Sequence, residues 1–156
     1  MNVRKLLMFL PILLGVWMLS GCDDDEKKID LGELPAKARS FIDNYFHGTD
    51  IRSIVQEKEN GHKEYQVELS DGTDLEFDED GGWTNIECHF NPIPTGILHA
   101  KVEAKVEELH PKAFIYGVEK EPGGYVVEVT AADGIDWDMR FNTQFEYISQ
   151  SQDRHD

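Results

Sequence analysis

Residues 65–77 decide the fold class, and they read Tyr65-Gln66-Val67-Glu68-Leu69-Ser70-Asp71-Gly72-Thr73-Asp74-Leu75-Glu76-Phe77. Apolar and polar side chains alternate on both sides of a Ser-Asp-Gly-Thr turn. A period of two that is interrupted by such a turn is typical of a half-buried antiparallel hairpin. If the apolar members face a core, the acidic members face the opposite side of the sheet. The stretch therefore predicts paired strands with one acidic face.

The same plan recurs along the chain and predicts an α+β fold. Segments with helical spacing open at Leu34-Pro35 and at Ile93-Pro94, and alternating runs joined by Gly- and Asn-rich turns follow each of them. We expect two tandem repeats, each one helix followed by a four-stranded antiparallel meander, with the helices packed on one face of the sheet. In the alignment of the two repeats, residues 72–77 correspond to residues 134–139, and Trp83 corresponds to Phe145. One repeat would be small alone, so the two are expected to share one sheet or one core.

The amino terminus predicts where the protein resides. Two basic residues precede an apolar run, residues 6–19, which is too short to span a bilayer and ends in Leu19-Ser20-Gly21-Cys22. These last four residues resemble the lipobox of a bacterial lipoprotein signal. That resemblance implies cleavage before Cys22, lipidation of its sulfur and stable anchoring in a membrane. An ordinary signal peptide and an uncleaved anchor are the alternatives.

Four segments follow from this organisation. Residues 1–21 are the expected lipoprotein signal peptide, and residues 22–33 an acidic, flexible tether. The acidic run behind Cys22 resembles export signals of surface-exposed lipoproteins, with a solvated spacer as the equal alternative. Residues 34–149 form the expected domain, with repeat one at 34–88 and repeat two at 93–149. Residues 150–156 are the expected disordered tail.

The charge of the chain excludes some partners. The chain has 31 Asp and Glu against 15 Lys and Arg, and a formal net charge of −16. Such a surface repels nucleic acid, so no nucleic-acid partner is expected. The location predicted is the bacterial cell envelope, lipid-anchored, either periplasmic or surface-exposed at the outer membrane.

Several stretches of the chain resemble the PepSY-like family, which is also described as β-lactamase-inhibitor-protein-like. The elements that carry the resemblance are Leu34-Pro35, Phe41 to Phe46, Tyr65 to Gly72 and Glu76 to Trp83. The resemblance covers nearly all of residues 34–148. It is weaker in the second half, where residues 138–142 depart from the usual turn. It implies a secreted or periplasmic protein with a helix-plus-sheet fold and one uncovered sheet face. It implies no agreed activity and no inhibitory residues.

The acidic sheet face is the first candidate site. Like charges on neighbouring strands repel, so a face that concentrates them is suited to a protein or peptide partner of basic character. A solvated face of an acidic protein is the alternative. The candidate binding residues are Glu68, Asp74, Glu76, Glu128, Asp136 and Asp138.

A calcium site is the second candidate. Glu76, Asp78, Asp80, Gly81 and Glu87 stand at positions 1, 3, 5, 6 and 12 of a calcium-loop pattern. However, a β-hairpin turn would need the same residues, and strand alternation surrounds them. The metal-ligand candidates are therefore Glu76, Asp78, Asp80 and Glu87, as an alternative to a plain turn.

Catalysis has no positive motif in this sequence. The six histidines show no paired metal-ligand spacing, and neither a nucleophile elbow nor a phosphate-binding loop is present. With Cys22 lipidated, Cys88 has no disulfide partner, and we expect it to be a buried, inert thiol. The sequence therefore predicts a non-enzymatic binding or inhibitory module without a cofactor. A calcium-binding protein and an envelope enzyme are the alternatives.

Overall fold

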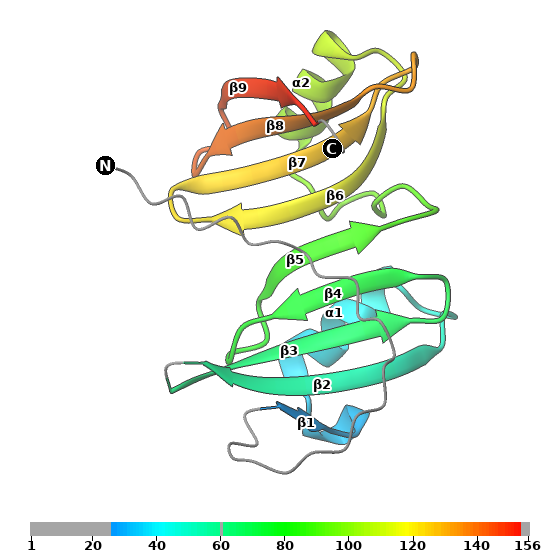
Figure 1. Cartoon of the computed structure of the whole chain (residues 1–156), viewed down its shortest axis with the longest axis vertical. Helices are drawn as coiled ribbons and strands as arrows, with labels where there is room; N and C mark the ends of the chain where they lie inside the picture. Colours follow the sequence, from blue (N-terminus) through cyan, green and yellow to red (C-terminus); the bar gives the residue numbers. More distant parts are fainter. Residues whose placement is uncertain (1–25, 60, 154–156) are drawn as a thin grey trace, which may run out of the picture.

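A single antiparallel sheet of nine strands organises the protein (Figure 1). The computed structural model describes residues 26–59 and 61–153. The strands lie in chain order from β1 to β9, and every neighbouring pair is antiparallel. Their bounds are β1 Glu26–Lys28, β2 Ile51–Glu59, β3 His62–Leu69, β4 Thr73–Phe77, β5 Trp83–Cys88, β6 Phe114–Glu121, β7 Gly124–Thr130, β8 Asp136–Asn142 and β9 Tyr147–Gln152.

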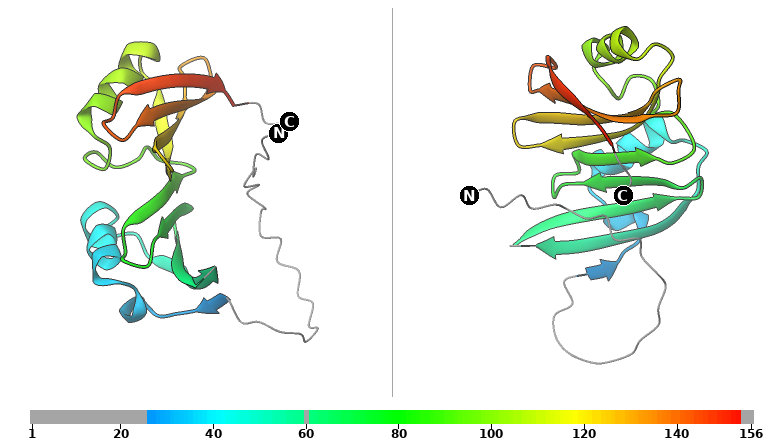
Figure 2. Two further views of the ribbon diagram at one scale, coloured as in Figure 1. Left: turned by 90° about the vertical axis from the view of Figure 1, so that its left-hand side faces the viewer. Right: turned by 45° about the horizontal axis from the view of Figure 1, so that its top comes forward.

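Strands β5 and β6 make the sheet continuous. Their ladder pairs Asn85 with Glu119, Ile86 with Val118 and Glu87 with Gly117. The chain leaves β5 and passes through helix α2, Ala100–Leu109, before it returns as β6. The strands before and after this joint belong to one sheet, and Figure 2 shows its two halves on either side of the joint. The residues that face one side of β5 therefore lie beside those that face the same side of β6.

The hairpin of residues 65–77 forms as its pattern predicts. Tyr65 pairs with Phe77 and Val67 with Leu75, and these four side chains are at most 6% exposed. Gly72 closes the turn with φ +87°, a conformation that glycine adopts without the steric penalty of a side chain. The buried residues of both halves of the chain form one hydrophobic cluster.

Two α-helices occur among the described residues, α1 at Ala36–Tyr45 and α2 at Ala100–Leu109. Ala38 and Ile42 of α1, and Val102 and Val106 of α2, are buried and join the hydrophobic cluster. A short 3-10 helix, η1 at Leu31–Glu33, precedes α1. Helix α2 lies at one end of the molecule, and α1 lies behind β3 and β4 in the other half (Figure 1).

The expected architecture of two helix-plus-four-strand repeats with helices on one face of the sheet is wrong. The described chain is mostly one nine-stranded antiparallel sheet, with only two α-helices. The physical reason is that a period of two reports which face a side chain occupies but not which strand lies beside it. Neither the pairing of β5 with β6 nor the ninth strand β1 has a signature in that period.

Three expected boundaries also differ from the structure. Residues 26–28, expected in the flexible tether, form β1 and pair with β2, and η1 follows within the same segment. Residues 150–152, expected in the tail, belong to β9. The second helix begins at Ala100 rather than near Pro94. Strand β1 is Glu-Lys-Lys, so backbone pairing forms it without an apolar signal, as is common for edge strands.

The turns after β4 and after β8 have the same hydrogen bonds. The Asp78 N–H donates to the Gly82 carbonyl (2.8 Å) and the Gly81 N–H to the Asp78 carbonyl (2.9 Å). In the second turn Asn142 donates to Glu146 (2.9 Å) and Phe145 to Asn142 (3.0 Å). Phe145 therefore matches Gly81, and the expected match of Phe145 with Trp83 is wrong.

Candidate functional site

A line of carboxylates crosses six adjacent strands on one face of the sheet. The register pairs Glu68 with Asp74 and Asp74 with Glu87. Glu87 pairs with Gly117, Gly117 with Glu128, and Glu128 with Asp138. We call this line the acidic row; its members are Glu68, Asp74, Glu87, Glu128 and Asp138.

Core packing fixes the direction of the acidic row. Leu69 and Leu75, whose side chains alternate with those of Glu68 and Asp74, are at most 1% exposed. The side chains of Glu68 and Asp74 are 39% and 48% exposed, and that of Glu87 is 24% exposed. A slip of one residue would carry the apolar set into water, so the hydrophobic cluster holds the carboxylates on the opposite face.

Gly117 occupies the position on β6 where a sixth side chain of the row would stand. A Cβ atom built there would lie 1.8 Å from Glu128 Oε2. The Glu128 carboxylate therefore lies over the backbone of β6, in space that only glycine leaves free. The ladder between β6 and β7 is irregular next to it, because the register shifts between Ile115 and Gly117.

The position of Glu128 has an electrostatic consequence. The pKa of Glu128 is raised to about 7. Burial is the main cause, and repulsion from Glu87 and Asp138 adds to it. Burial likewise raises the pKa of Glu76 and of Glu119 above the ordinary range. Burial beside Glu128 raises the pKa of Tyr116, which lies at the register shift of β6. The centre of the acidic face therefore holds carboxylates that are costly to ionise.

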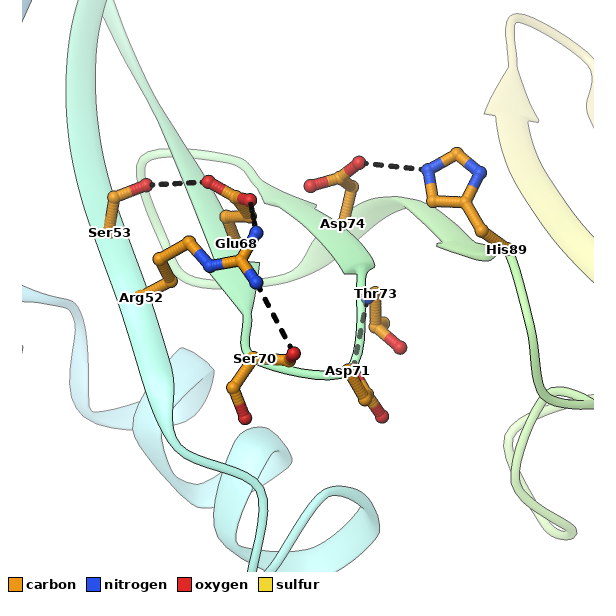
Figure 3. Close-up of polar contacts among 8 residues, drawn as sticks. All are labelled: Arg52, Ser53, Glu68, Ser70, Asp71, Thr73, Asp74 and His89. Carbon is orange, nitrogen blue, oxygen red and sulfur yellow. Dashed lines mark hydrogen bonds and ion pairs between the residues drawn. The ribbon is translucent and has the colours of Figure 1, made fainter.

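Basic side chains contact the acidic row at its β3 and β4 end (Figure 3). Arg52 forms an ion pair with Glu68 and donates from Nη2 to the Ser70 carbonyl (3.3 Å). His89 lies between two members of the row, with Nε2 3.1 Å from Asp74 Oδ2 and Nδ1 3.3 Å from Glu87 Oε1. The row thus already holds a guanidinium and an imidazole, the kinds of group that a basic partner would bring.

Most of the predicted binding residues come together. Glu68, Asp74, Glu128 and Asp138 are members of the acidic row. Glu76 lies on the same face one position along, where it pairs with Gln66 and Asn85. Asp136 stands outside the row, at the start of β8, where its Oδ1 accepts from Thr130 Oγ1 (2.6 Å).

Sequence reasoning missed Glu87, His89 and Gly117 as parts of this face. Glu87 lies between the buried residues Ile86 and Cys88, and this alternation indicates that it faces outward. Glu87 was instead assigned to the calcium-loop pattern. Gly117 and His89 carry no local signal, since their roles depend on the β5–β6 and β4–β5 pairings.

The proposed calcium ligands do not gather around one point. Asp78 Oδ1 accepts from the N–H groups of Asp80 (3.1 Å) and Gly82 (2.7 Å), which closes the hairpin turn. Glu87 lies in the acidic row. Among residues 26–59 and 61–153, no group of three or more His, Cys, Asp or Glu side chains is arranged to hold a metal ion.

Of the two cysteines, only Cys88 lies within the described residues. Cys88 is 1% exposed, which confirms its expected burial, and burial raises the pKa of its thiol to about 11. Cys22 and the expected signal peptide lie outside the described residues. Within the described part of the chain, neither helix is long and apolar enough to cross a membrane.

The fold is that of an antiparallel-sheet protein with a row of carboxylates on one face. The PepSY-like family, described as β-lactamase-inhibitor-like, matches residues 63–149, more than half of the chain. The protein belongs to this family, as the sequence resemblance predicted. No curated protein matches the chain.

Solved structures of similar proteins come from Bacteroides. A "putative periplasmic protein from DUF2874 family" of Bacteroides vulgatus is 28% identical, with a TM-score of 0.75, over 82% of this chain and 98% of its own. A "putative calcium-regulated periplasmic protein" of Bacteroides thetaiotaomicron is 25% identical, with a TM-score of 0.74 and the same coverage of both chains. A further B. vulgatus structure is 25% identical, with a TM-score of 0.72, over 81% of this chain and 98% of its own. These neighbours support a periplasmic location.

Replacing Glu128 should make the protein more stable at alkaline pH. Because the folded-state pKa is raised, the folded protein keeps a proton that the unfolded chain has released, and stability falls as pH rises from about 4.5 to about 7. We expect Glu128→Gln to gain about 1–2 kcal/mol at pH 8, allowing for solvent screening, and nothing at pH 4. Urea unfolding at both pH values measures this.

Glu103→Gln on α2 is the matched control, because it removes one charge outside the row. It should keep the pH slope of the wild type. If Glu128→Gln shows the wild-type slope as well, the account of a strained carboxylate over Gly117 is wrong.

Proposed function

We propose that this protein is a non-enzymatic binding module of the cell envelope that contacts a basic protein or peptide through the acidic row. The observation that carries the proposal is the row itself, in which five of six adjacent strands each place a carboxylate in one line and the sixth has Gly117. Neighbouring strands lie about 4.8 Å apart. Basic side chains three or four positions apart on a helix are separated by about 5–6 Å. A basic helix laid across the strands would therefore meet successive members of the row.

Electrostatics supports a cationic partner. Burial first, and repulsion from Glu87 and Asp138 second, raise the pKa of Glu128, so an approaching positive charge would relieve part of an existing repulsion as well as adding an attraction. The overall charge of −16 steers such a partner toward the protein and repels anionic surfaces. Membership of a family described as inhibitor-like is consistent with a role in binding, with no chemical step assigned.

The second part of the proposal concerns attachment. Residues 19–22 carry the lipobox pattern, and similar structures are periplasmic proteins. We propose that the mature chain begins at Cys22 and is anchored by lipid in the envelope, at the periplasmic side or at the outer-membrane surface. The acidic face would then be presented to partners close to a membrane.

Neutralising the row should weaken binding of a cationic probe. We expect the triple variant Glu68→Gln, Glu87→Gln, Glu128→Gln to bind a fluorescent decalysine peptide roughly tenfold more weakly than the wild type, because close charge pairs are lost. Fluorescence anisotropy at 50 and 300 mM NaCl measures the affinity and its salt dependence.

The control removes the same three charges elsewhere, with Asp43→Asn, Glu103→Gln and Glu108→Gln on the two helices. This variant should stay within about threefold of the wild type, since only long-range attraction changes. Equal losses in the two triple variants would mean that net charge alone attracts the probe, and the acidic row would lose its assigned role.

Substitution of Cys22 should release the protein from the membrane. The sulfur of Cys22 is the expected attachment point of the lipid, and several acyl chains at one residue give stable anchoring. We expect the wild-type protein to partition into the detergent phase of Triton X-114 and Cys22→Ser to remain in the aqueous phase. Detergent partition of the Cys22→Ser chain equal to that of the wild type would refute lipid anchoring at this residue.

Calcium binding is the second candidate function, and one observation favours it. A similar structure is named a "putative calcium-regulated periplasmic protein". Since Asp78 closes its own turn, the hairpin is a poor candidate for the ligands, and the more crowded carboxylates lie on the sheet face. A ligand that binds only the folded state raises its stability.

If calcium binds, 5 mM calcium should raise the melting temperature by several degrees relative to EDTA, and an equal ionic strength of sodium chloride should not. Identical melting curves in calcium and in EDTA would exclude this candidate.

A further inference from the structure

A cavity of about 550 Å³ lies apart from the acidic row, where the start of α2 meets β5, β6, β7 and the β8–β9 turn. Its floor consists of Val102, Val118 and Val127, which are at most 2% exposed. Small-molecule pockets have about this volume and are lined mainly by apolar and aromatic side chains with a few polar groups. We call this cavity the aromatic pocket.

Four rings form a continuous wall of the aromatic pocket. Trp83 and Tyr125 have ring centroids 6.3 Å apart, and Tyr125 stacks on Phe145 at 5.3 Å. Phe145 stacks on His99 at 4.4 Å with an interplanar angle of 4°. Because Phe145 stacks on both His99 and Tyr125, another ring would meet this wall mainly at ring edges, in the edge-to-face geometry that aromatic pairs also adopt.

The charge of the aromatic pocket is opposite to that of the protein. Among the residues that the structure describes, Lys120 is the only one lining the pocket with a formal charge, and no Asp or Glu of that part lines it, in a chain that has 31 of them. Lys120 Nζ lies 3.8 Å from the centroid of the Trp83 ring and donates to the Trp83 carbonyl (2.6 Å). An ammonium has three N–H donors, so this bond leaves two for a ligand or solvent.

Lys120 and His99 form the polar edge of the aromatic pocket. Partial burial lowers the pKa of Lys120, while Asp78 opposes this effect from outside the pocket lining. Asp78 is itself held in its turn by two backbone N–H groups. His99 Nδ1 accepts from the Lys101 N–H (3.2 Å), so its neutral ring carries the proton on Nε2 and can donate. The edge thus offers donors and one positive charge, which suit an anion.

The backbone conformation of Phe145 also marks the aromatic pocket as unusual, independently of its charge. Phe145 has φ +61°, in the left-handed region that bulky residues avoid. The matching residue of the other turn, Gly81, has φ +78°, and a Cβ there would lie 2.7 Å from Pro35 Cβ. Pro35 occupies the N-cap position of α1, as His99 does in α2. An aromatic ring thus stands where the other turn has glycine, and such strain is concentrated at functional sites.

We propose that the aromatic pocket binds a small aromatic carboxylate, with its ring against Tyr125 and Phe145 and its carboxylate on Lys120. This site is separate from the contact surface proposed above, because the acidic row repels an anion that the pocket attracts. A lysine-to-carboxylate hydrogen bond is charge-assisted, so the charge of the ligand should contribute strongly to its affinity.

The test uses 2-naphthoate as the probe and neutral 2-naphthamide as its matched partner. We expect naphthoate to bind about tenfold more tightly than the amide in a calorimetric titration, with amide-proton shifts at the pocket residues in NMR spectra. Lys120→Gln should remove this preference. Lys101→Gln, an exposed lysine of α2 outside the pocket, should keep it.

Phe145→Gly separates binding from folding. Glycine accepts the left-handed backbone, and this relief of strain offsets part of the packing that is lost with the ring, so the variant should stay folded by circular dichroism while both probes lose at least threefold in affinity. Equal affinity of naphthoate and naphthamide for the wild type, or unchanged naphthoate binding by Lys120→Gln, would overturn the proposal. Tighter binding of the peptide Ala-Phe-Phe than of naphthoate would also overturn it, in favour of a peptide carboxyl terminus.

Discussion

The pairing of β5 with β6 is the constraint on which both sites depend. Ile86 and Val118 meet there, and each is fully buried, so the ladder is held by the hydrophobic cluster as well as by backbone hydrogen bonds. On one face it brings Glu87 beside Gly117 and so extends the acidic row from β3 to β8. Near the ends of the same strands it brings Lys120 onto Trp83. One short ladder therefore creates a negatively charged face and a separate pocket that contains a lysine.

The two sites show how packing can hold unfavourable chemistry in place. A carboxylate over the β6 backbone and an aromatic residue in a left-handed turn each cost free energy. Both persist because strands with almost fully buried apolar faces surround them, and shifting either strand would expose that face to water. The stability of the sheet thus maintains the repulsion among the carboxylates, which a cationic partner would reduce, and the shape of the aromatic pocket, which a flat ligand would fill.

Local signals in the sequence predicted the faces of the strands but not their neighbours. The alternation in residues 65–77 placed Glu68 and Asp74 on the outer face correctly, because burial of Leu69 and Leu75 leaves no other choice. The overall architecture was wrong, since strand order is set by long-range pairing that no local period records. Gly117, His89 and the pocket residues Lys120 and Phe145 come together only through that pairing. Strand β1 was missed because it is charged throughout.

Native-state hydrogen exchange of the β5 and β6 amides tests the central claim most directly. If one continuous sheet positions both sites, these amides should exchange only through global unfolding, with the same free energy as the most protected amides of β3 and β7. Fast exchange at β5 and β6, or two distinct exchange free energies for the strands before and after this joint, would contradict the account. Either result would mean that the acidic row and the aromatic pocket are not held by a common sheet.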